Sequence, residues 1–315
     1  QISLDKQSGD NLLSDFDRVF KNLGLTSNSN YQEYYDEFVS LDSSYKSLLD
    51  TSDKFVTYGT DENDSMTGSA IDEAFFGGSG DDTIYSRQGN DIVYGGDGDD
   101  YIDTCEGDDI VYGGNGNDTI LGGEGNDLLY GEDGDDNIQT GGGQDTVYGG
   151  AGNDTIFAVS GTGYLNGGEG NDIITVGSRG NFTIEGGRGD DILTGATENY
   201  IPNETNFIYN LGDGNDTIYA NVNIENIIFG EGITLENTRF QALPNEDIVI
   251  TFANCEGSIT IKEGVRKFND RDSVVFADGT KISGQELENY FAIYGTEGDD
   301  VIEGTGESET IYGLG

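Results

Sequence analysis

The sequence predicts a mainly β fold built from short repeats, and three features of the repeat support this class. From Gly59 to Thr175 the chain runs in thirteen consecutive units of nine residues. The first, second and fourth positions of a unit are preferentially Gly, the sixth is preferentially Asp, and the eighth is apolar in every unit. A Gly-rich turn followed by three residues with one central apolar side chain matches a short strand with one inward side chain. Each unit is therefore expected to be one turn and one strand.

The turn part of the unit is suited to gathering oxygen atoms. Gly at its first, second and fourth positions permits positive φ and lets backbone carbonyls pack around an ion. Rows of carboxylates about 4.8 Å apart would repel one another strongly unless a cation bridges them. The alternative is a purely steric Gly/Asp turn without metal. The carboxylates at the sixth position are Asp82, Asp91, Asp100, Asp109, Asp118, Asp127, Asp136, Asp145, Asp154 and Asp172.

The overall charge and the narrow core point in the same direction. The chain has 61 Asp and Glu against 14 Lys and Arg, a formal net charge of −47, so a hard divalent cation is the obvious neutralising partner. One inward apolar side chain per unit gives too little burial to offset the entropy of ordering the chain. Cation binding is therefore expected to supply folding free energy.

Units such as GGSGDDTIY from Gly77 and GGNGNDTIL from Gly113 follow the pattern GGxGxDxUx. In this pattern the chain resembles the RTX (repeats-in-toxin) family across residues 59–194. The resemblance implies a right-handed parallel β-roll, a calcium-binding solenoid in which two units complete one coil and Ca2+ bridges each turn to the turn two units later. It implies up to about eleven Ca2+ ions in the main roll. The residues expected to bind calcium are Asp64, Gly77, Ser79, Asp82, Asp91, Gly95, Asp97, Asp100, Asp109, Gly113, Asn115, Asp118, Asp127, Asp136, Asp145, Asp154, Asp172, Asp191, Asp213, Asp216 and Asp300.

Because one coil is two units, alternate turns stack on opposite edges of the roll. Edge 1 is formed by the turns of the units that begin at 59, 77, 95, 113, 131, 149 and 167, and edge 2 by those that begin at 68, 86, 104, 122, 140 and 158. Edge 1 keeps the Gly-rich turn from 77 onward. Edge 2 has Ser86-Arg87, Thr104-Cys105 and Thr140 where Gly is preferred, and Glu73 and Gly163 replace the Asp. We therefore predict two classes of calcium site, with tighter binding along edge 1.

The strands that follow edge 2 carry outward aromatic side chains at the ninth position, which we call the aromatic ladder. Their seventh positions are mostly apolar as well, so this face would be a large exposed apolar patch. Three interpretations stay open: another part of the chain covers the face, the rings stack on a carbohydrate or a host-surface receptor, or copies of the protein associate through it. The residues of the aromatic ladder are Phe76, Tyr94, Tyr112, Tyr130 and Tyr148.

The flanks of the roll differ from it in composition. Residues 1–58 have helical apolar spacing and are expected to be a helical N-terminal cap or flank. Residues 195–294 are strand-like, with a hairpin expected at Asp278-Gly279, and resemble the haemolysin-type calcium-binding-related domain that follows RTX blocks; Asp213 and Asp216 would lie in one more calcium turn. Residues 295–315 are expected to start a further RTX block. The two cysteines show no pairing or metal signature, and we expect free thiols.

Several classes of function are excluded. The chain contains no His, which argues against catalytic triads and His-based metalloproteases, and it has no HExxH or GxSxG motif, so we predict no enzyme activity. The strong negative charge argues against nucleic-acid binding. There is no apolar run long enough for a transmembrane segment.

The remaining reading is a non-catalytic, monomeric calcium-binding module of a large secreted bacterial RTX protein, an adhesin or a toxin-like exoprotein. On this reading Ca2+ outside the cell drives folding after type I secretion. The alternative is an auxiliary RTX module of a secreted enzyme, such as a protease, a lipase or a polysaccharide-modifying enzyme, located elsewhere in the parent chain. The chain begins at Gln1 without a signal-like segment, and we expect it to be part of a longer protein.

Overall fold

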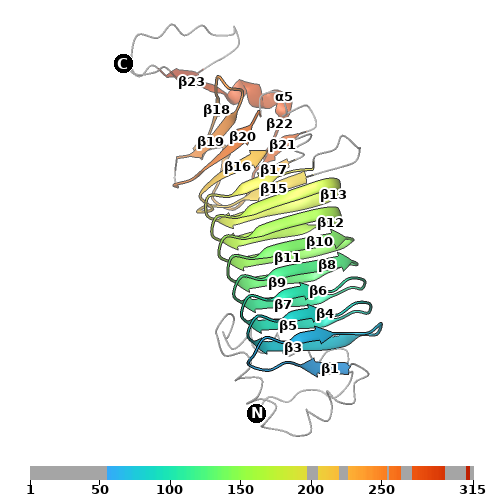
Figure 1. Ribbon diagram of the computed structural model, residues 1–315. Helices are drawn as coiled ribbons and strands as arrows, with labels where there is room; N and C mark the ends of the chain where they lie inside the picture. Colours follow the sequence, from blue (N-terminus) through green and yellow to red (C-terminus); the bar gives the residue numbers. More distant parts are fainter. Residues whose placement is uncertain are drawn as a thin grey trace, which may run out of the picture.

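The described residues form one elongated stack of short strands. The computed structural model describes residues 55–196, 205–219, 226–253, 255–263, 272–294 and 310–312. Strand β1 (Phe55–Tyr58) lies near one end of the stack and β23 (Ala292–Tyr294) at the other (Figure 1). The expected N-terminal helices in residues 1–54 and the expected ligand Asp300 lie outside the described residues.

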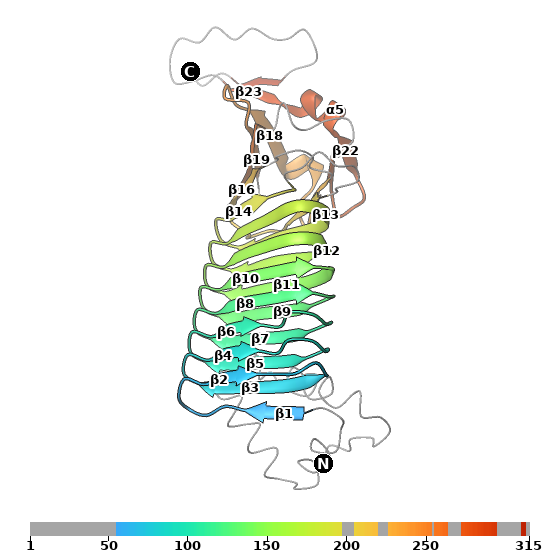
Figure 2. The same cartoon turned by 45° about the vertical axis from the view of Figure 1, so that its right-hand side comes forward.

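The main part of the stack is a parallel β-solenoid, which confirms the predicted fold class. Up to β10, each strand pairs in parallel with the strand two positions on, and paired residues are 18 apart, as in Phe75 with Val93 and Ile84 with Ile102. Further along, the long strands β12 and β13 pair with each other. One coil is therefore two units, and the coils follow one another along the axis (Figure 2). The strands are β2 (Ser65–Thr67), β3 (Glu73–Ser79), β4 (Thr83–Tyr85), β5 (Ile92–Asp97), β6 (Tyr101–Asp103), β7 (Ile110–Asn115), β8 (Thr119–Glu124), β9 (Leu128–Asp133), β10 (Asn137–Gly142), β11 (Gln144–Ala151), β12 (Thr155–Glu169), β13 (Ile173–Arg188) and β14 (Ile192–Thr194).

The core of the solenoid is the row of eighth-position side chains. Each strand contributes one of them, and from Phe75 onward they are completely buried between the two faces. They form one continuous cluster, because residues 18 apart lie directly above one another. These side chains are Phe75, Ile84, Val93, Ile102, Val111, Ile120, Leu129, Ile138, Val147, Ile156, Leu165 and Ile174.

The solenoid starts earlier than the boundary at residue 59 that the sequence predicts. Strand β1 pairs in parallel with β3 in the same 18-residue register, with Thr57 beside Phe75. Val56, Thr57 and Tyr58 thus take the seventh to ninth positions of a preceding unit. The sequence does not predict this unit, because the residues that precede Val56 do not have the Gly-rich pattern of a turn. The expected helical flank 1–58 is therefore wrong for residues 55–58.

Edge 2 loses its turn where the sixth-position Asp is missing. Gly163 provides no side chain to organise a turn, and β12 runs extended through this position. Strand β13 follows the same path beside it, with a register shift near Ala158 that absorbs the one extra residue of the ten-residue unit. Among the described residues from this coil onward, the Gly-rich turn is kept at edge 1.

The described strands between Thr205 and Val275 continue the solenoid, so the expected domain boundary at 194/195 is not a structural break. The parallel order β13, β15, β17, β21 extends one face and the order β14, β16, β20 extends the other. One buried cluster runs without interruption from Met66 to Leu287. This part of the cluster contains larger aromatic side chains and is wider. Coils around a wider core do not have to be identical, which explains why the nine-residue repeat is no longer visible in the sequence here. The strands are β15 (Thr205–Tyr209), β16 (Asn215–Tyr219), β17 (Asn226–Phe229), β20 (Ser258–Lys262) and β21 (Ser273–Val275).

Antiparallel strands close this end of the molecule. Strands β18 (Thr238–Ala242) and β19 (Ile248–Phe252) form a hairpin that joins β20, after the 3-10 turn η2 (Leu235–Asn237). The predicted hairpin at Asp278-Gly279 is confirmed, since it joins β21 to β22 (Lys281–Ser283), and Gly279 has a φ of +87°. The short helix α5 (Gly284–Leu287) and η3 (Glu288–Tyr290) follow.

A second pair of strands has the register of a β-roll. Strand β23 pairs in parallel with β24 (Thr310–Tyr312), and the paired residues are again 18 apart. This spacing agrees with the expected start of a further repeat block, although its turns lie outside the described residues. Phe291, just before β23, forms a parallel bridge with Phe240 of β18.

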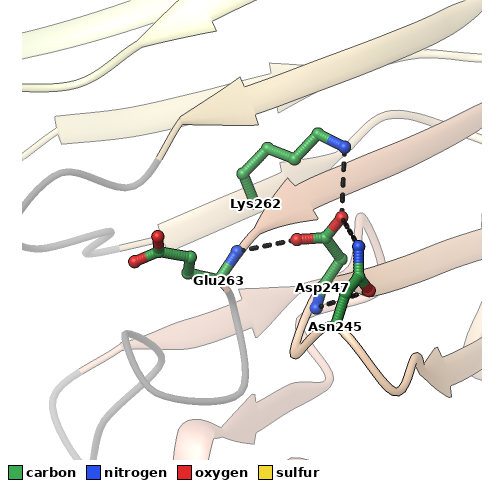
Figure 3. Close-up of polar contacts among 4 residues, drawn as sticks. All are labelled: Asn245, Asp247, Lys262 and Glu263. Carbon is green, nitrogen blue, oxygen red and sulfur yellow. Dashed lines mark hydrogen bonds and ion pairs between the residues drawn. The ribbon is translucent and has the colours of Figure 1, made fainter.

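A buried carboxylate fastens the hairpin loop to the end of β20. Asp247 accepts hydrogen bonds from the backbone N–H of Glu263 at 2.9 Å, from Lys262 Nζ at 3.1 Å and from Asn245 Nδ2 at 2.8 Å (Figure 3). These donors, the Glu263 N–H above all, lower the pKa of Asp247. The carboxylate is thus fully partnered and belongs to the scaffold rather than to a metal site.

We expect Asp247→Asn to lower the free energy of unfolding by about 1 to 3 kcal/mol, because either orientation of the amide places an NH2 group against a donor. Chemical denaturation at saturating calcium measures the change. Asp278→Asn is the control, since Asp278 is exposed and caps only its own turn at Thr280. Equal effects of the two substitutions would contradict the anchoring role of Asp247.

Candidate metal centre

The sixth-position carboxylates of edge 1 form a continuous buried row. One oxygen of each, Oδ1, accepts the backbone N–H of the sixth-position residue in the preceding coil, as from Asp82 to Asp100 at 2.7 Å and from Asp100 to Asp118 at 2.8 Å. The row starts with the N–H of Asp64 and ends at Asp216. Its carboxylates are almost completely buried: Asp82, Asp100, Asp118, Asp136, Asp154, Asp172, Asp191 and Asp216.

The other oxygen, Oδ2, has no protein partner in seven of these eight carboxylates, all except Asp216. Buried polar atoms normally find a hydrogen bond, and leaving a charged oxygen without one is costly. Eleven Oδ2 atoms among the described residues break this rule, all of them in sixth-position side chains. They belong to Asp82, Asp91, Asp100, Asp109, Asp118, Asp127, Asp136, Asp145, Asp154, Asp172 and Asp191.

Each orphaned oxygen of edge 1 faces a space kept open by the first-position Gly. A Cβ placed on Gly77 would overlap both Oδ2 of Asp82 and the carbonyl oxygen of Gly95 in the next coil. We call such a space, lined by a carboxylate oxygen and a carbonyl oxygen, a cradle. It is suited to a hard cation, which prefers oxygen ligands of both kinds. The same arrangement recurs at Gly77, Gly95, Gly113, Gly131, Gly149 and Gly167.

Carboxylates alone do not complete the sites. Among the described ranges, no group of three or more Asp, Glu, Cys or His side chains lies close enough to hold a metal ion. Backbone carbonyls must therefore supply further ligands. This agrees with the Gly-rich turn, in which the absence of Cβ atoms lets carbonyls of adjacent coils approach.

Burial raises the pKa of these carboxyl groups. Desolvation is the largest cause, and it raises the pKa of Asp118 to about 8 although the N–H of Asp100 opposes the change; the charges of Asp136 and Asp100 add to the increase. Desolvation is also the main cause that raises the pKa of Asp100 and Asp154 to about 7 and the pKa of Asp172 to about 6. Without a cation, the folded turn therefore favours the protonated form.

The raised pKa values predict the sign of the pH dependence. The cation-free folded state keeps protons up to about pH 7, which the unfolded chain releases near its ordinary value of 3.8. Its stability therefore falls as pH rises through this window. Protons and calcium compete for the same oxygens, so we expect apparent calcium affinity to increase from about pH 5 to about pH 8. Calcium titrations followed by circular dichroism at several pH values test this, and a flat profile would contradict it.

Edge 2 has a shorter row. The backbone N–H of Glu73 donates to Asp91, and the row continues through Asp109 and Asp127 to Asp145, where it ends because Gly163 has no carboxylate. The Glu73 carboxylate accepts a hydrogen bond from the backbone N–H of Ser69 at 2.5 Å. The first-position side chains Ser86, Thr104 and Thr140 are completely buried.

Three expected ligands differ from the rest. Oδ2 of Asp64 already accepts the N–H and the hydroxyl of Thr60, at 2.6 and 2.9 Å. Asp213 takes the third position of its turn, and its Oδ2 accepts the N–H of Asn210 at 2.5 Å. Asp216 sits in the sixth position, buried, with its pKa raised to about 8, chiefly by desolvation and then by the charge of Asp191. Of these three, Asp216 best matches the pattern of the main roll.

The expected third-position ligands Ser79, Asp97 and Asn115 lie on the rim of edge 1. Asn115 donates through Nδ2 to Oδ1 of Asp97 at 2.6 Å, so these two side chains interact with one another. The carbonyls of Asp97 and Asn115 accept the N–H of Gly80 and Gly98 in the preceding coil. The side chains of Asp97 and Asn115 are therefore paired with each other, and the carbonyl of each accepts one N–H from the preceding coil.

The sequence analysis missed a second hydrogen-bonding row at the fifth position. There, a side-chain oxygen accepts the N–H of the next coil, as from Asp99 to Asp81 at 3.1 Å and from Asn117 to Asp99 at 2.7 Å. This direction is opposite to that of the sixth-position row, so each turn is tied to both neighbours. The signal was present as a preference for Asn or Asp at Asn63, Asp81, Asp99, Asn117, Asp135, Asn153, Asn171 and Asp190.

The aromatic ladder is present and is longer than predicted. Consecutive rings stack face to face, with centroids 4.7 to 5.2 Å apart, from Tyr58 through to Tyr148, and Tyr164 closes the row edge-on. At the N-terminal part of this face the outward side chains of Ala74, Phe76 and Ile92 are only 4 to 8% exposed, whereas Tyr148 is 37% exposed. Part of the face is therefore shielded from solvent.

A solenoid with two nonapeptide units per coil and oxygen-lined cradles along its edges defines a calcium-binding β-roll. The chain belongs to the RTX family: a sequence model of the RTX calcium-binding nonapeptide repeat, four copies long, matches residues 67–102, 106–138, 130–165, 166–200 and 292–315. No curated protein matches the chain. Among solved structures, the chain has a similarity to the extracellular lipase LipA from Serratia marcescens, with 17% identity and a TM-score of 0.25. That similarity covers 73% of this chain and 39% of the lipase, so the chain spans about two fifths of the length of that protein.

Two further features bear on the class of protein. None of the helices in the described ranges is long and apolar enough to cross a membrane. Cys105 and Cys255 are both free, as expected, and burial raises the pKa of the Cys105 thiol to about 11. The Cys105 thiol is thus a poor nucleophile.

Proposed function

We propose that this chain is a non-catalytic, calcium-folded module of a secreted bacterial RTX protein, an adhesin or a toxin-like exoprotein. The row of buried sixth-position carboxylates, each with one oxygen lacking a protein partner, carries this proposal. A protein that folded without a cation would leave eleven such oxygens uncompensated. Calcium supplies charge neutralisation and bridges between coils when it is bound.

We assign the calcium ligands by position in the turn. The sixth-position carboxylates would supply their Oδ2 atoms, the first-position glycines Gly77, Gly95 and Gly113 their carbonyls, and Ser79, Asp97 and Asn115 theirs at the third position. Asp64 and Asp213 are weaker candidates because protein donors already engage them. The orphaned oxygens limit the main roll to about eleven ions.

Calcium concentration would distinguish an export state from a folded state. Extracellular calcium modules bind with dissociation constants of about 10⁻⁴ to 10⁻³ M, which leaves them empty at cytosolic calcium levels. An empty chain with a charge of −47 would stay extended through self-repulsion, as suits passage through a type I exporter. Binding outside the cell would then fold the roll and retain it there.

A calcium titration tests this proposal. We expect a cooperative gain of β structure by far-UV circular dichroism with a midpoint of about 10⁻⁴ to 10⁻³ M. Metal analysis of the folded sample should find several ions per chain. A midpoint in the micromolar range or below would contradict the export argument, and the absence of bound calcium would overturn the function itself.

The geometry of the aromatic ladder does not favour a carbohydrate site. Sugar rings stack on the open face of an aromatic ring, but here each ring presents its face to the next ring of the ladder. The burial of Ala74, Phe76 and Ile92 instead favours the interpretation that part of the chain covers this face. The ladder would then be a second packing surface of the module.

A further inference from the structure

We propose that residues 1–54 pack, through the apolar row of residues 12–23, on the first coils of the face that carries the aromatic ladder. These residues lie outside the described ranges, and the burial of the described surface is what points to them. The contact involves a face of the roll and not its turns, so it is separate from the proposed calcium binding.

Two isoleucines of this face differ in exposure although they hold equivalent positions. Ile92 and Ile110 both take the seventh position of their units, in neighbouring coils. Ile92 lies between Ala74 and Ile110, whereas Ile110 lies between Ile92 and Leu128, so Ile92 has the smaller neighbour and should be the more exposed. It is only 8% exposed, however, and Ile110 is half-buried. Ile92 is therefore covered by something other than its neighbours in the sheet.

The rings of the aromatic ladder show the same difference. Phe76 is stacked between Tyr58 and Tyr94, and Tyr112 is stacked in the same way between Tyr94 and Tyr130. Phe76 is nevertheless buried, with 7% exposed, whereas Tyr112 is half-buried. The cover thus lies over the first coils of the ladder and ends before its middle.

The described residues do not supply this cover. Ala74, Phe76 and Ile92 form a small buried cluster of their own, separate from the core of the roll. Among the described residues, the apolar side chains packed against it belong to the same face: Val56, Tyr94 and Ile110. The cover therefore comes from a part of the chain outside the described ranges.

Reach identifies that part of the chain. The internal segments outside the described ranges that are longer than one residue start at β14 or beyond it: 197–204, 220–225, 264–271 and 295–309. β15 is six coil steps from β5, about 29 Å at about 4.8 Å per coil. Eight residues extend out and back by at most about 16 Å, and residues 295–309 start from β23 at the far end of the stack (Figure 1). Residues 1–54 instead lead directly into Phe55 of β1, which pairs with β3 on this face.

The apolar row of residues 12–23 suits this surface. Its side chains recur at helical intervals and would lie on one side of a helix. Twelve helical residues are about 18 Å long, and the four coils from β1 to β7 span about 14 Å. The row consists of Leu12, Leu13, Phe16, Val19, Phe20 and Leu23.

Charge favours this segment over a second copy of the chain. Residues 1–54 contain 5 of the 14 Lys and Arg and 10 of the 61 Asp and Glu, so their net charge is −5 and that of the remaining chain is −42. Two rolls that met through the ladder would bring two such strongly negative bodies together. Residues 1–54 can cover the same apolar surface with far less repulsion.

The test measures hydroxyl-radical labelling of the full chain by mass spectrometry at saturating calcium. In the wild type, Ile92 should be labelled more slowly than Ile110. Phe16→Asp with Phe20→Asp places two carboxylates in the apolar row, and labelling of Phe76 should then rise about fivefold, the ratio of the exposed fractions of Tyr148 and Phe76, 37% and 7%.

Asn11→Asp with Asn22→Asp is the matched control. It adds the same charge to the same segment, on the polar side of the predicted helix, and should leave the labelling of Phe76 unchanged. Tyr219 is the internal reference, since it is 41% exposed and lies on the other face of the roll. Its labelling should be the same in all three proteins.

Each other outcome overturns the inference. Equal labelling of Ile92 and Ile110 in the wild type would show that the face has no cover. An unchanged Phe76 in the Phe16/Phe20 variant would show that residues 12–23 do not provide it, and labelling that falls as the protein dimerises would assign the cover to a second copy. If circular dichroism shows that this variant is unfolded, Phe16→Ser with Phe20→Ser repeats the test. A wild type without bound calcium would overturn the proposed function and leave these comparisons unaffected.

Discussion

Removal of calcium with EDTA is expected to abolish the β-roll rather than to loosen it. Each coil contributes only two inward apolar side chains, and the carboxylates of its turns are buried with one oxygen unpartnered. Without a cation, desolvation and mutual repulsion act on every turn at once, as the raised pKa values of Asp100, Asp118 and Asp154 indicate. We expect the far-UV spectrum to change from β structure to coil, with loss of the cooperative melting transition.

The control for this experiment is the return of calcium. Excess CaCl2 added after EDTA should restore the spectrum, because the loss is a linked equilibrium and not damage to the chain. Magnesium should restore it poorly, since it prefers rigid octahedral sites and gives up its water reluctantly. A spectrum and melting temperature that EDTA leaves unchanged would show that the Gly/Asp turn is purely steric.

The second large effect is expected for Asp118→Asn in the middle of edge 1. Asn keeps the Oδ1 that accepts the Asp100 N–H but replaces the unpartnered oxygen by an NH2 group that cannot bind a cation. Calcium binding at this turn should weaken by at least the roughly 10- to 100-fold seen when a supporting ligand contact is lost.

Asp99→Asn is the matched control for Asp118→Asn. It removes the same charge from the same edge, and its Oδ1 can still accept the Asn117 N–H. The side chain of Asp99 is exposed and lies in the fifth position, outside the cradle. The calcium midpoint for folding should therefore move for Asp118→Asn and stay near the wild type for Asp99→Asn. Equal shifts in the two variants would mean that net charge, and not ligation, controls folding.

The periodic part of the fold was predictable because every unit repeats the same pattern of residue types. Gly fixes the turn, the sixth-position Asp faces its interior, and the eighth-position side chain points inward, so the register of 18 follows from two units per coil. The edges of the roll were less predictable. β1 continues the stack without a recognisable turn, and the described strands between Thr205 and Val275 continue it with a wider aromatic core. Parallel pairing depends on the strand already formed and not on the nine-residue pattern.

In the candidate site, too, some features were predictable from the sequence and others were not. The sequence identifies the sixth-position carboxylates and the asymmetry between edges, since both depend on residue type at a fixed position. It does not reveal that Oδ1 is used by the neighbouring coil while Oδ2 is left without a partner, or that fifth-position side chains tie the turns in the opposite direction. These facts depend on which atoms of residues 18 apart meet, which only the stacked coils decide.

The sequence by itself therefore determined the class of protein, the repeat unit and the cation that the charge of −47 requires, because all three are properties of composition and period. The tertiary structure decided where the roll begins and how far it continues. It also decided which oxygens line a cradle, as Oδ2 of Asp100 and the carbonyl oxygen of Gly113 do at Gly95. The physical reason is that a cradle is lined by oxygens from two successive coils, so neither coil alone contains the site.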